Sequence, residues 1–203
     1  MAFRVTPLMA VASSTQPQPA FGSWVTAGAG LAAPSDVPIT LTLGTACASG
    51  NDAAQLFVAG EPAWIVKPDN SVAETVFIKS VSNNTLVLGN QTLSTPTRNN
   101  YVTLNSYPVG AIGTGAFLIP KPNFNNIIVV YEDNGTGPWL YIGKSPTFTT
   151  SVNRIFKLPN VASGTFPTFW NAGMFSPGNP YDLSELYIRG TAGDQFTTVL
   201  NID

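Results

Sequence analysis

Glu132 and Asp133 are the only adjacent pair of acidic residues in the chain, and paired carboxylates could perform glycoside hydrolysis. A glycosidase holds its two carboxyl groups about 5–9.5 Å apart across a sugar. Neighbouring residues at the end of a strand point to opposite faces, so this pair would not face one substrate. We expect Asp133 to begin a turn by bonding the backbone. Calcium binding by Asp133 and Asn134 is the other possibility, although this loop lacks the dense acidic ligand set of strong calcium sites.

The segment Gly143-Lys144-Ser145 resembles the end of a phosphate-binding loop. That loop requires a glycine five residues earlier and a helix immediately after it, so that helix-terminal N–H groups face the phosphate. Here Pro138 occupies the glycine position, a strand pattern precedes the segment, and Pro146 follows it. We therefore predict an ordinary turn.

The sequence offers few residues for nucleophilic catalysis, because the chain has no histidine and Cys47 is its single cysteine. A catalytic thiolate needs a neighbouring base, usually histidine, and an intramolecular disulfide needs a second cysteine. We predict that Cys47 is a small buried apolar side chain. The sequence thus predicts no catalytic residue, no cofactor and no metal, and a protein that is not an enzyme.

Charged residues make up only 10% of the chain and hydrophobic residues 44%, whereas charged residues are about 25% of an ordinary soluble domain. The net charge of −2 gives no basic field of the kind that nucleic-acid binding requires, so no nucleic-acid partner is expected. The centres of protein interfaces are poor in Lys, Glu and Asp and rich in aromatics. The composition therefore favours a surface docked on other proteins; a monomer with a neutral polar coat is the alternative.

The apolar stretch at the N-terminus is broken by Pro7 and is too short to cross a bilayer. We expect no membrane partner, and folding in the cytoplasm where the chain is made.

Residues 1–38 have the composition of an extended arm, because prolines and glycines interrupt every periodic pattern in this segment. The arm nevertheless carries three large aromatic side chains, Phe3, Phe21 and Trp24. We interpret them as candidate interface anchors on a neighbouring subunit. The alternative is that they fold back onto their own domain.

The rest of the chain predicts an all-β fold. Residues 39–119 are interpreted as a small SH3-like barrel, and residues 123–203 as a β-sandwich of jelly-roll type, joined at Pro120-Lys121-Pro122. A hairpin turn is expected at residues 82–85, where two asparagines suit positive φ, and a second hairpin is expected to join 126–132 to 139–142. The apolar residues on both faces of 126–132 indicate a strand buried on both sides. The predicted strands cover residues 39–43, 56–58, 63–66, 76–81, 86–89, 101–104, 116–119, 126–132, 139–142, 154–158, 165–170, 186–188 and 196–202.

The segment Asn179-Pro-Tyr-Asp-Leu-Ser-Glu-Leu-Tyr-Ile-Arg-Gly-Thr-Ala-Gly-Asp194 resembles the C-terminal strands of virion proteins of tailed bacteriophages. Residues 126–132 and 137–143 share this similarity. The resemblance implies a head decoration (cement) protein, a β-rich subunit on the capsid surface of the virion that stabilises the shell. It implies the major capsid protein and neighbouring copies of the chain as partners. It transfers no catalytic residue.

Three functional hypotheses follow. The first is a capsid decoration protein, and the second is a tail, baseplate or fibre module that binds host glycan through exposed aromatic and amide side chains. Trp64, Trp139 and Trp170 are candidates for such stacking and are equally good core residues. The third, a glycan depolymerase, would need two facing carboxylates.

Overall fold

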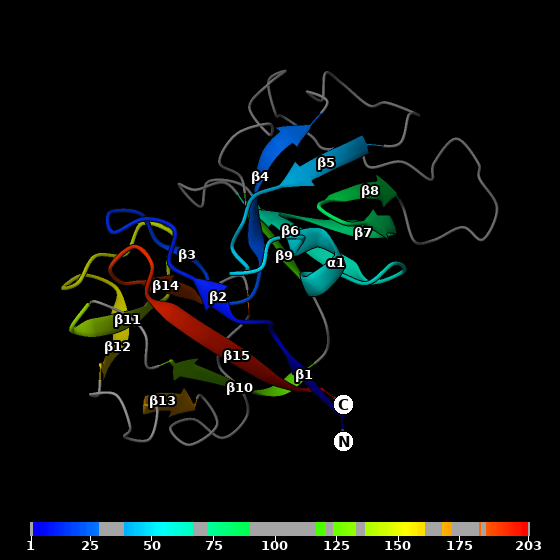
Figure 1. The fold of residues 1–203 in the computed structure, drawn as a ribbon. Helices are drawn as coiled ribbons and strands as arrows, with labels where there is room; N and C mark the ends of the chain where they lie inside the picture. The colour runs from blue at the N-terminus through cyan, green and yellow to red at the C-terminus, as the bar shows by residue number, and fades with distance from the viewer. Residues whose placement is uncertain are drawn as a thin grey trace. The chain divides into compact units, whose positions relative to one another are not determined.

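The computed structural model describes residues 2–28, 39–66, 73–89, 117–120, 124–132, 137–160, 168–171, 183 and 186–202. Its described part is predominantly β-structure and divides into two compact units (Figure 1). Unit 1 comprises Met1–Phe21, Ala46–Ser49 and Asn123–Asp203, and unit 2 comprises Gly22–Thr45 and Gly50–Pro122. No described helix is long and apolar enough to cross a membrane.

Unit 2 is a closed barrel of six strands in the order β4-β5-β8-β7-β6-β9, with every neighbouring pair antiparallel. Leu41 and Leu43 are buried while Thr40 is exposed, which is the alternation that the sequence predicts. The elements of this unit are β4 (Ser23–Gly28), β5 (Ile39–Leu43), α1 (Asp52–Leu56), β6 (Pro62–Val66), β7 (Ala73–Ser82), β8 (Thr85–Gly89) and β9 (Phe117–Pro120).

The predicted turn at 82–85 joins β7 to β8, although of its two asparagines only Asn83 has positive φ.

 That φ of 47° lies in the left-handed region, which asparagine tolerates better than most residues. The other asparagine acts differently, because the Asn84 side chain donates to the carbonyl oxygen of Leu43 and ties the turn to β5.

The predicted strand at 56–58 is wrong. Residues Asp52–Leu56 form the single helix α1 of the described chain, which begins after Asn51 in the left-handed region at φ 57°. Leu56, the first residue of the predicted strand, is fully buried as part of this short helix, whereas Val58 is 49% exposed after the helix has ended. The predicted strand at 101–104 lies outside the described residues.

Unit 1 contains two sheets. The first, sheet A, has the order β1-β15-β10-β13, with β2 also paired to β15; the second, sheet B, has the order β12-β11-β14-β3. Alternate residues of β10, β11 and β15 are fully buried. The strands are β1 (Ala2–Val5), β2 (Met9–Ala10), β3 (Gln18–Pro19), β10 (Phe124–Tyr131), β11 (Trp139–Gly143), β12 (Arg154–Pro159), β13 (Thr168–Asn171), β14 (Tyr187–Arg189) and β15 (Gln195–Ile202).

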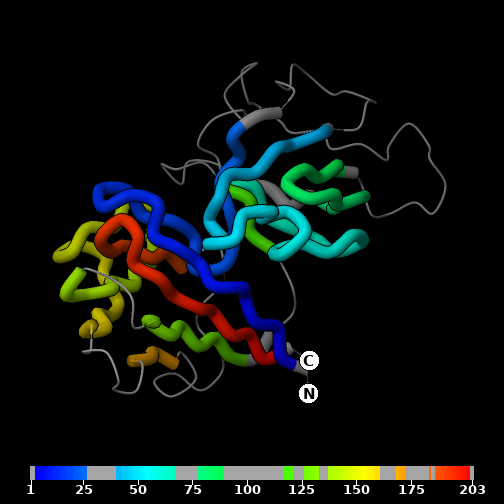
Figure 2. The backbone as a smooth tube through the Cα atoms, in the orientation of Figure 1, coloured from blue at the N-terminus to red at the C-terminus, as the bar shows by residue number. Residues whose placement is uncertain are grey.

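The N-terminal residues differ from the extended arm predicted for 1–38. Strand β1 pairs with β15 along its length, from Ala2 opposite Ile202 to Val5 opposite Val199, so the first and last strands run side by side (Figure 2). Strand β3 pairs with β14, and β4 belongs to the barrel. The division into units therefore differs from three consecutive segments, because unit 1 combines both ends of the chain.

The predicted hairpin between 126–132 and 139–142 is also wrong, because β10 and β11 belong to different sheets. The Tyr131 hydroxyl donates to the carbonyl oxygen of Gly137 at 2.9 Å, which links the end of β10 to the chain just before β11. Strand β10 instead lies between β15 and β13. Its inner residues are fully buried, whereas Ile128 and Val130 on the other face are only half-buried.

Candidate interaction surface

The described residues contain a buried serine–carboxylate pair in unit 2. The Ser23 hydroxyl on β4 donates to Oδ2 of Asp52 at the start of α1, and both residues are fully buried. Nucleophilic catalysis by serine needs a general base and access to substrate. The chain has no histidine, and neither side chain reaches the surface, so this pair fastens α1 to the barrel wall.

Asp194 forms a second buried polar cluster, in unit 1. Its Oδ1 accepts a hydrogen bond from the N–H of Gly137 at 3.0 Å, and its Oδ2 accepts one from the N–H of Thr191 at 2.8 Å. A Cβ atom on Gly137 would lie 2.6 Å from Asp194 Oδ2, so the approach requires glycine. Burial, and then the Asp194 charge, raise the pKa of Tyr131 above its ordinary value. The Asp194 carboxylate therefore joins the turn at Thr191 to the chain at Gly137 by hydrogen bonds.

The other residues considered for catalysis have structural roles where they are described. Glu132 accepts a hydrogen bond from the Thr197 hydroxyl at 2.7 Å, and Asp133 lies outside the described residues. Gly143 ends strand β11, and the chain bends at Lys144 and Ser145 without opening a helix; the Ser145 carbonyl accepts a hydrogen bond from the N–H of Phe148 at 3.0 Å and closes the turn that follows. Within the described ranges, no group of three or more His, Cys, Asp or Glu residues is placed to hold a metal ion.

Cys47 is 1% exposed and its thiol lies 3.9 Å from the sulfur of Met9. This confirms the prediction of a buried apolar side chain.

The three predicted anchors have different surroundings. Phe21 is 1% exposed and its ring lies 5.4 Å from the Arg4 guanidinium carbon in the same unit, so in this conformation it is a core residue and cannot anchor a second subunit. Trp24 is half-buried, and its indole packs on Gly44 so closely that a Cβ atom would not fit there. Phe3 is 64% exposed and remains available for contact.

Phe3 belongs to a larger apolar surface, the outer face of sheet A. Directly paired residues of antiparallel strands point to the same side of a sheet, and the register aligns Val5 with Val199 and Val199 with Ile128. It likewise aligns Val130 with Phe169. The outer face therefore carries six apolar side chains from four strands: Phe3, Val5, Ile128, Val130, Phe169 and Val199.

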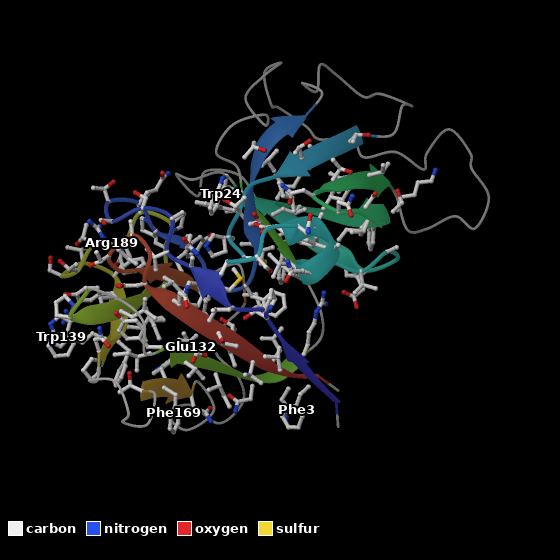
Figure 3. The ribbon with its side chains drawn as sticks, in the orientation of Figure 1. Phe3, Trp24, Glu132, Trp139, Phe169 and Arg189 are labelled. Carbon is white, nitrogen blue, oxygen red and sulfur yellow. The ribbon has the colours of Figure 1, made fainter. Side chains whose placement is uncertain are left out.

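This face is accessible and almost uncharged. Phe3, Val5 and Phe169 are 64%, 53% and 56% exposed; they are three of the seven large apolar side chains that are exposed in the described chain. Figure 3 shows Phe3 and Phe169 on the two outermost strands, β1 and β13. Glu132 is the one charged residue among the described residues of this face, and it is held by Thr197. Grouped apolar side chains of this kind mark interaction sites.

Sequence reasoning found one residue of this face, Phe3, and missed the others. It interpreted the two-sided apolar pattern of 126–132 as burial on both sides. The described structure fully buries one side and only half-buries the other, so the two-sided apolar pattern corresponds to a core on one face and an apolar outer surface on the other.

The chain matches no protein-family model, no curated protein and no solved structure.

Proposed function

We propose that this chain is a non-enzymatic structural protein that docks on a larger assembly through the outer face of sheet A. The observation that carries the proposal is the group of six apolar side chains on that face, three of them more than half exposed. Leaving such side chains in water is unfavourable, since fully burying one Val or Phe side chain contributes about 1.5–3 kcal/mol. Binding of a partner that covers the face is stabilised by this free energy of burial.

The assembly that we propose is the capsid of a tailed bacteriophage, with this chain as a decoration protein on the virion surface. The similarity of residues 179–194 to phage virion proteins and the low charge of the chain support this assignment. The major capsid protein would be the principal partner, and neighbouring copies of the chain would be further ones. A subunit that binds only the assembled lattice shifts the equilibrium towards the intact shell, and many copies act together.

The finer architecture belongs to the same proposal. The two sheets of unit 1 would be the layers of a β-sandwich of jelly-roll type, which is supported by the hydrogen bond from the Thr198 hydroxyl on β15 to the carbonyl of Ala20 beside β3. The six-stranded barrel of unit 2 would be of the small SH3-like type.

The proposal is tested by replacing exposed residues of the outer face. The test variant is Phe3→Ser/Val5→Ser/Phe169→Ser. Loss of the two phenylalanines alone removes roughly 2–4 kcal/mol of favourable binding free energy, taken as the burial free energy of each side chain multiplied by its exposed fraction in the free protein. We expect binding to capsid shells that lack this protein to weaken about twentyfold or more. Occupancy measured by co-sedimentation across a concentration series checks this.

Val152→Ser is the matched control, because Val152 is 58% exposed but lies in the turn before β12. It should bind as the parent does. Both variants should keep the parent's far-ultraviolet circular dichroism and midpoint of thermal unfolding. Equal occupancy by the folded triple variant and the control would refute docking through this face.

A further inference from the structure

Sheet B carries a second surface, which we call the basic face and which consists of Trp139, Tyr141, Arg154, Lys157 and Arg189. The register places Tyr141 between Lys157 on β12 and Arg189 on β14. It places Arg154 opposite Gly143. Alternate residues of β11, Leu140 and Ile142, are fully buried, so the basic face points away from the core.

The basic face is exceptional in a chain of net charge −2. Residues 137–160 contain three basic residues and no acidic residue, and Arg189 adds a fourth basic side chain. Strands β3, β11, β12 and β14 contain no acid either. This surface therefore has an electrostatic potential opposite to that of the molecule as a whole, and it attracts anionic ligands.

The loop of residues 144–153 holds one end of the basic face in place. The Phe148 ring packs over Gly143, where it leaves no room for a Cβ atom. The Phe148 carbonyl accepts a hydrogen bond from Nη1 of Arg189 at 3.4 Å, and the Thr150 carbonyl accepts one from Nη1 of Arg154 at 2.7 Å. Each guanidinium has five N–H donors, so both are oriented by the loop and keep donors for a ligand.

Trp139 orients the third cation. The Lys157 ammonium nitrogen lies 3.9 Å from the centroid of the Trp139 ring, which is a cation–π contact. The ring therefore serves as a support for the ammonium group, and the aromatic group left between two cations is the half-buried Tyr141. Figure 3 labels Trp139 and Arg189, which belong to β11 and β14 of this sheet.

We propose that the basic face binds an acidic polysaccharide. Lys157 and Arg189 lie on the strands on either side of β11, so their backbones are about 10 Å apart. A glycan of alternating neutral and acidic sugars spaces its anionic groups by two sugar units, a distance of this order. Its neutral sugar would then lie over Tyr141, whose ring and hydroxyl suit a sugar face and its hydroxyl groups.

Nucleic acid is a poorer match to the same geometry. Double-stranded DNA carries one negative charge about every 1.7 Å of its axis, and its affinity comes from neutralising many phosphates. The basic face has three cations, and the cation–π contact of Trp139 with Lys157 occupies a ring that base stacking would use. This inference is independent of docking through sheet A, because it concerns the other sheet.

The test measures binding of the full chain by isothermal titration calorimetry at low salt. The probes are a hyaluronan oligosaccharide, in which carboxylate-bearing glucuronate alternates with neutral N-acetylglucosamine, and a keratan sulfate oligosaccharide sulfated only on N-acetylglucosamine, in which a sulfated sugar alternates with neutral galactose; neutral dextran and single-stranded oligothymidylate are the comparisons. We expect one of the two acidic glycans to bind, with affinity that falls as salt rises. Which of them binds more tightly identifies the anionic group.

Lys157→Gln and Arg189→Gln should each weaken that binding about tenfold or more, since hydrogen bonds to charged groups contribute about 1.5–3 kcal/mol. Lys79→Gln is the matched control, because it removes the same charge from an exposed position of the barrel strand β7, and it should bind as the parent does. Three results would overturn the proposal: no binding of either acidic glycan, equal losses in all three variants, or oligothymidylate or dextran binding as tightly as the acidic glycans.

Discussion

At the residue scale, the buried acids of this protein build structure. Asp194 accepts hydrogen bonds from two backbone N–H groups in separate turns, and Asp52 accepts one from Ser23. Both carboxylates are fully buried, so these hydrogen bonds hold the fold together. The sequence-level resemblance at Gly190–Asp194 therefore coincides with a turn that the carboxylate of Asp194 closes.

Replacing the Asp194 carboxylate tests this role. Asp194→Asn keeps the shape but turns an –NH₂ group towards one of the two backbone N–H donors, and a buried donor left unsatisfied costs about 1–3 kcal/mol. We expect the free energy of unfolding in urea to fall by that amount. Glu132→Gln is the control, because an amide oxygen can still accept the Thr197 hydroxyl and stability should be nearly unchanged. Equal stability of both variants would show that Asp194 is dispensable.

Tyr131 makes the free energy of unfolding depend on pH in the alkaline range. Burial and the Asp194 charge raise its pKa, so the native state keeps a proton that the unfolded chain loses above pH about 10. Its contribution to stability is complete below that pH and is lost as the pH rises, at up to about 1.4 kcal/mol per pH unit.

Tyr131→Phe should remove this contribution to the slope. The Gly137 carbonyl keeps a partner in that variant, since it also accepts from the Asn160 side chain at 2.9 Å. Urea unfolding at several pH values between 9 and about 11 compares the two proteins. Identical slopes would mean that Tyr131 titrates alike in both states.

At the scale of elements, the N-terminal strands are structural parts of unit 1. Strands β1 and β2 pair with β15, and β3 pairs with β14, while Met9, Val11 and Phe21 are core residues. Deleting residues 1–21 should therefore unfold unit 1. The measurement is amide hydrogen exchange of β10 and β11, with Phe3→Ser as the folded control. Native-like protection after the deletion would show that these residues form a dispensable arm.

Local patterns predicted the local parts of the fold. The alternation at 39–43, the turn at 82–85 and the strand at 126–132 depend on residues close in sequence, and the described structure has all three. The pairing of β1 with β15 joins residues about two hundred positions apart, and no local pattern encodes it. The composition of residues 1–38 therefore resembled an arm, although most of its described residues belong to sheets.

The candidate surfaces were harder to predict for the same reason. Phe3 and Phe21 are the same residue type in the same segment, yet one is 64% and the other 1% exposed. The difference arises from which face of which sheet each side chain joins. The cations of the basic face are likewise spread from Arg154 to Arg189, and only the pairing of β12, β11 and β14 brings them together.

At the scale of the whole molecule, the low charge and the grouped apolar face both support the proposed role of a subunit that docks on a larger assembly. Charged residues are 10% of the chain, which lowers the desolvation cost of docking large areas. The apolar side chains of the outer face of sheet A give that docking its driving force.

A cryo-electron microscopy map of the particle that contains this protein tests the central proposal most directly. Our account predicts that the chain lies on the capsid shell, with Phe3, Val5 and Phe169 buried against the lattice. A map in which these three side chains face solvent, or in which the shell lacks the chain, would contradict it.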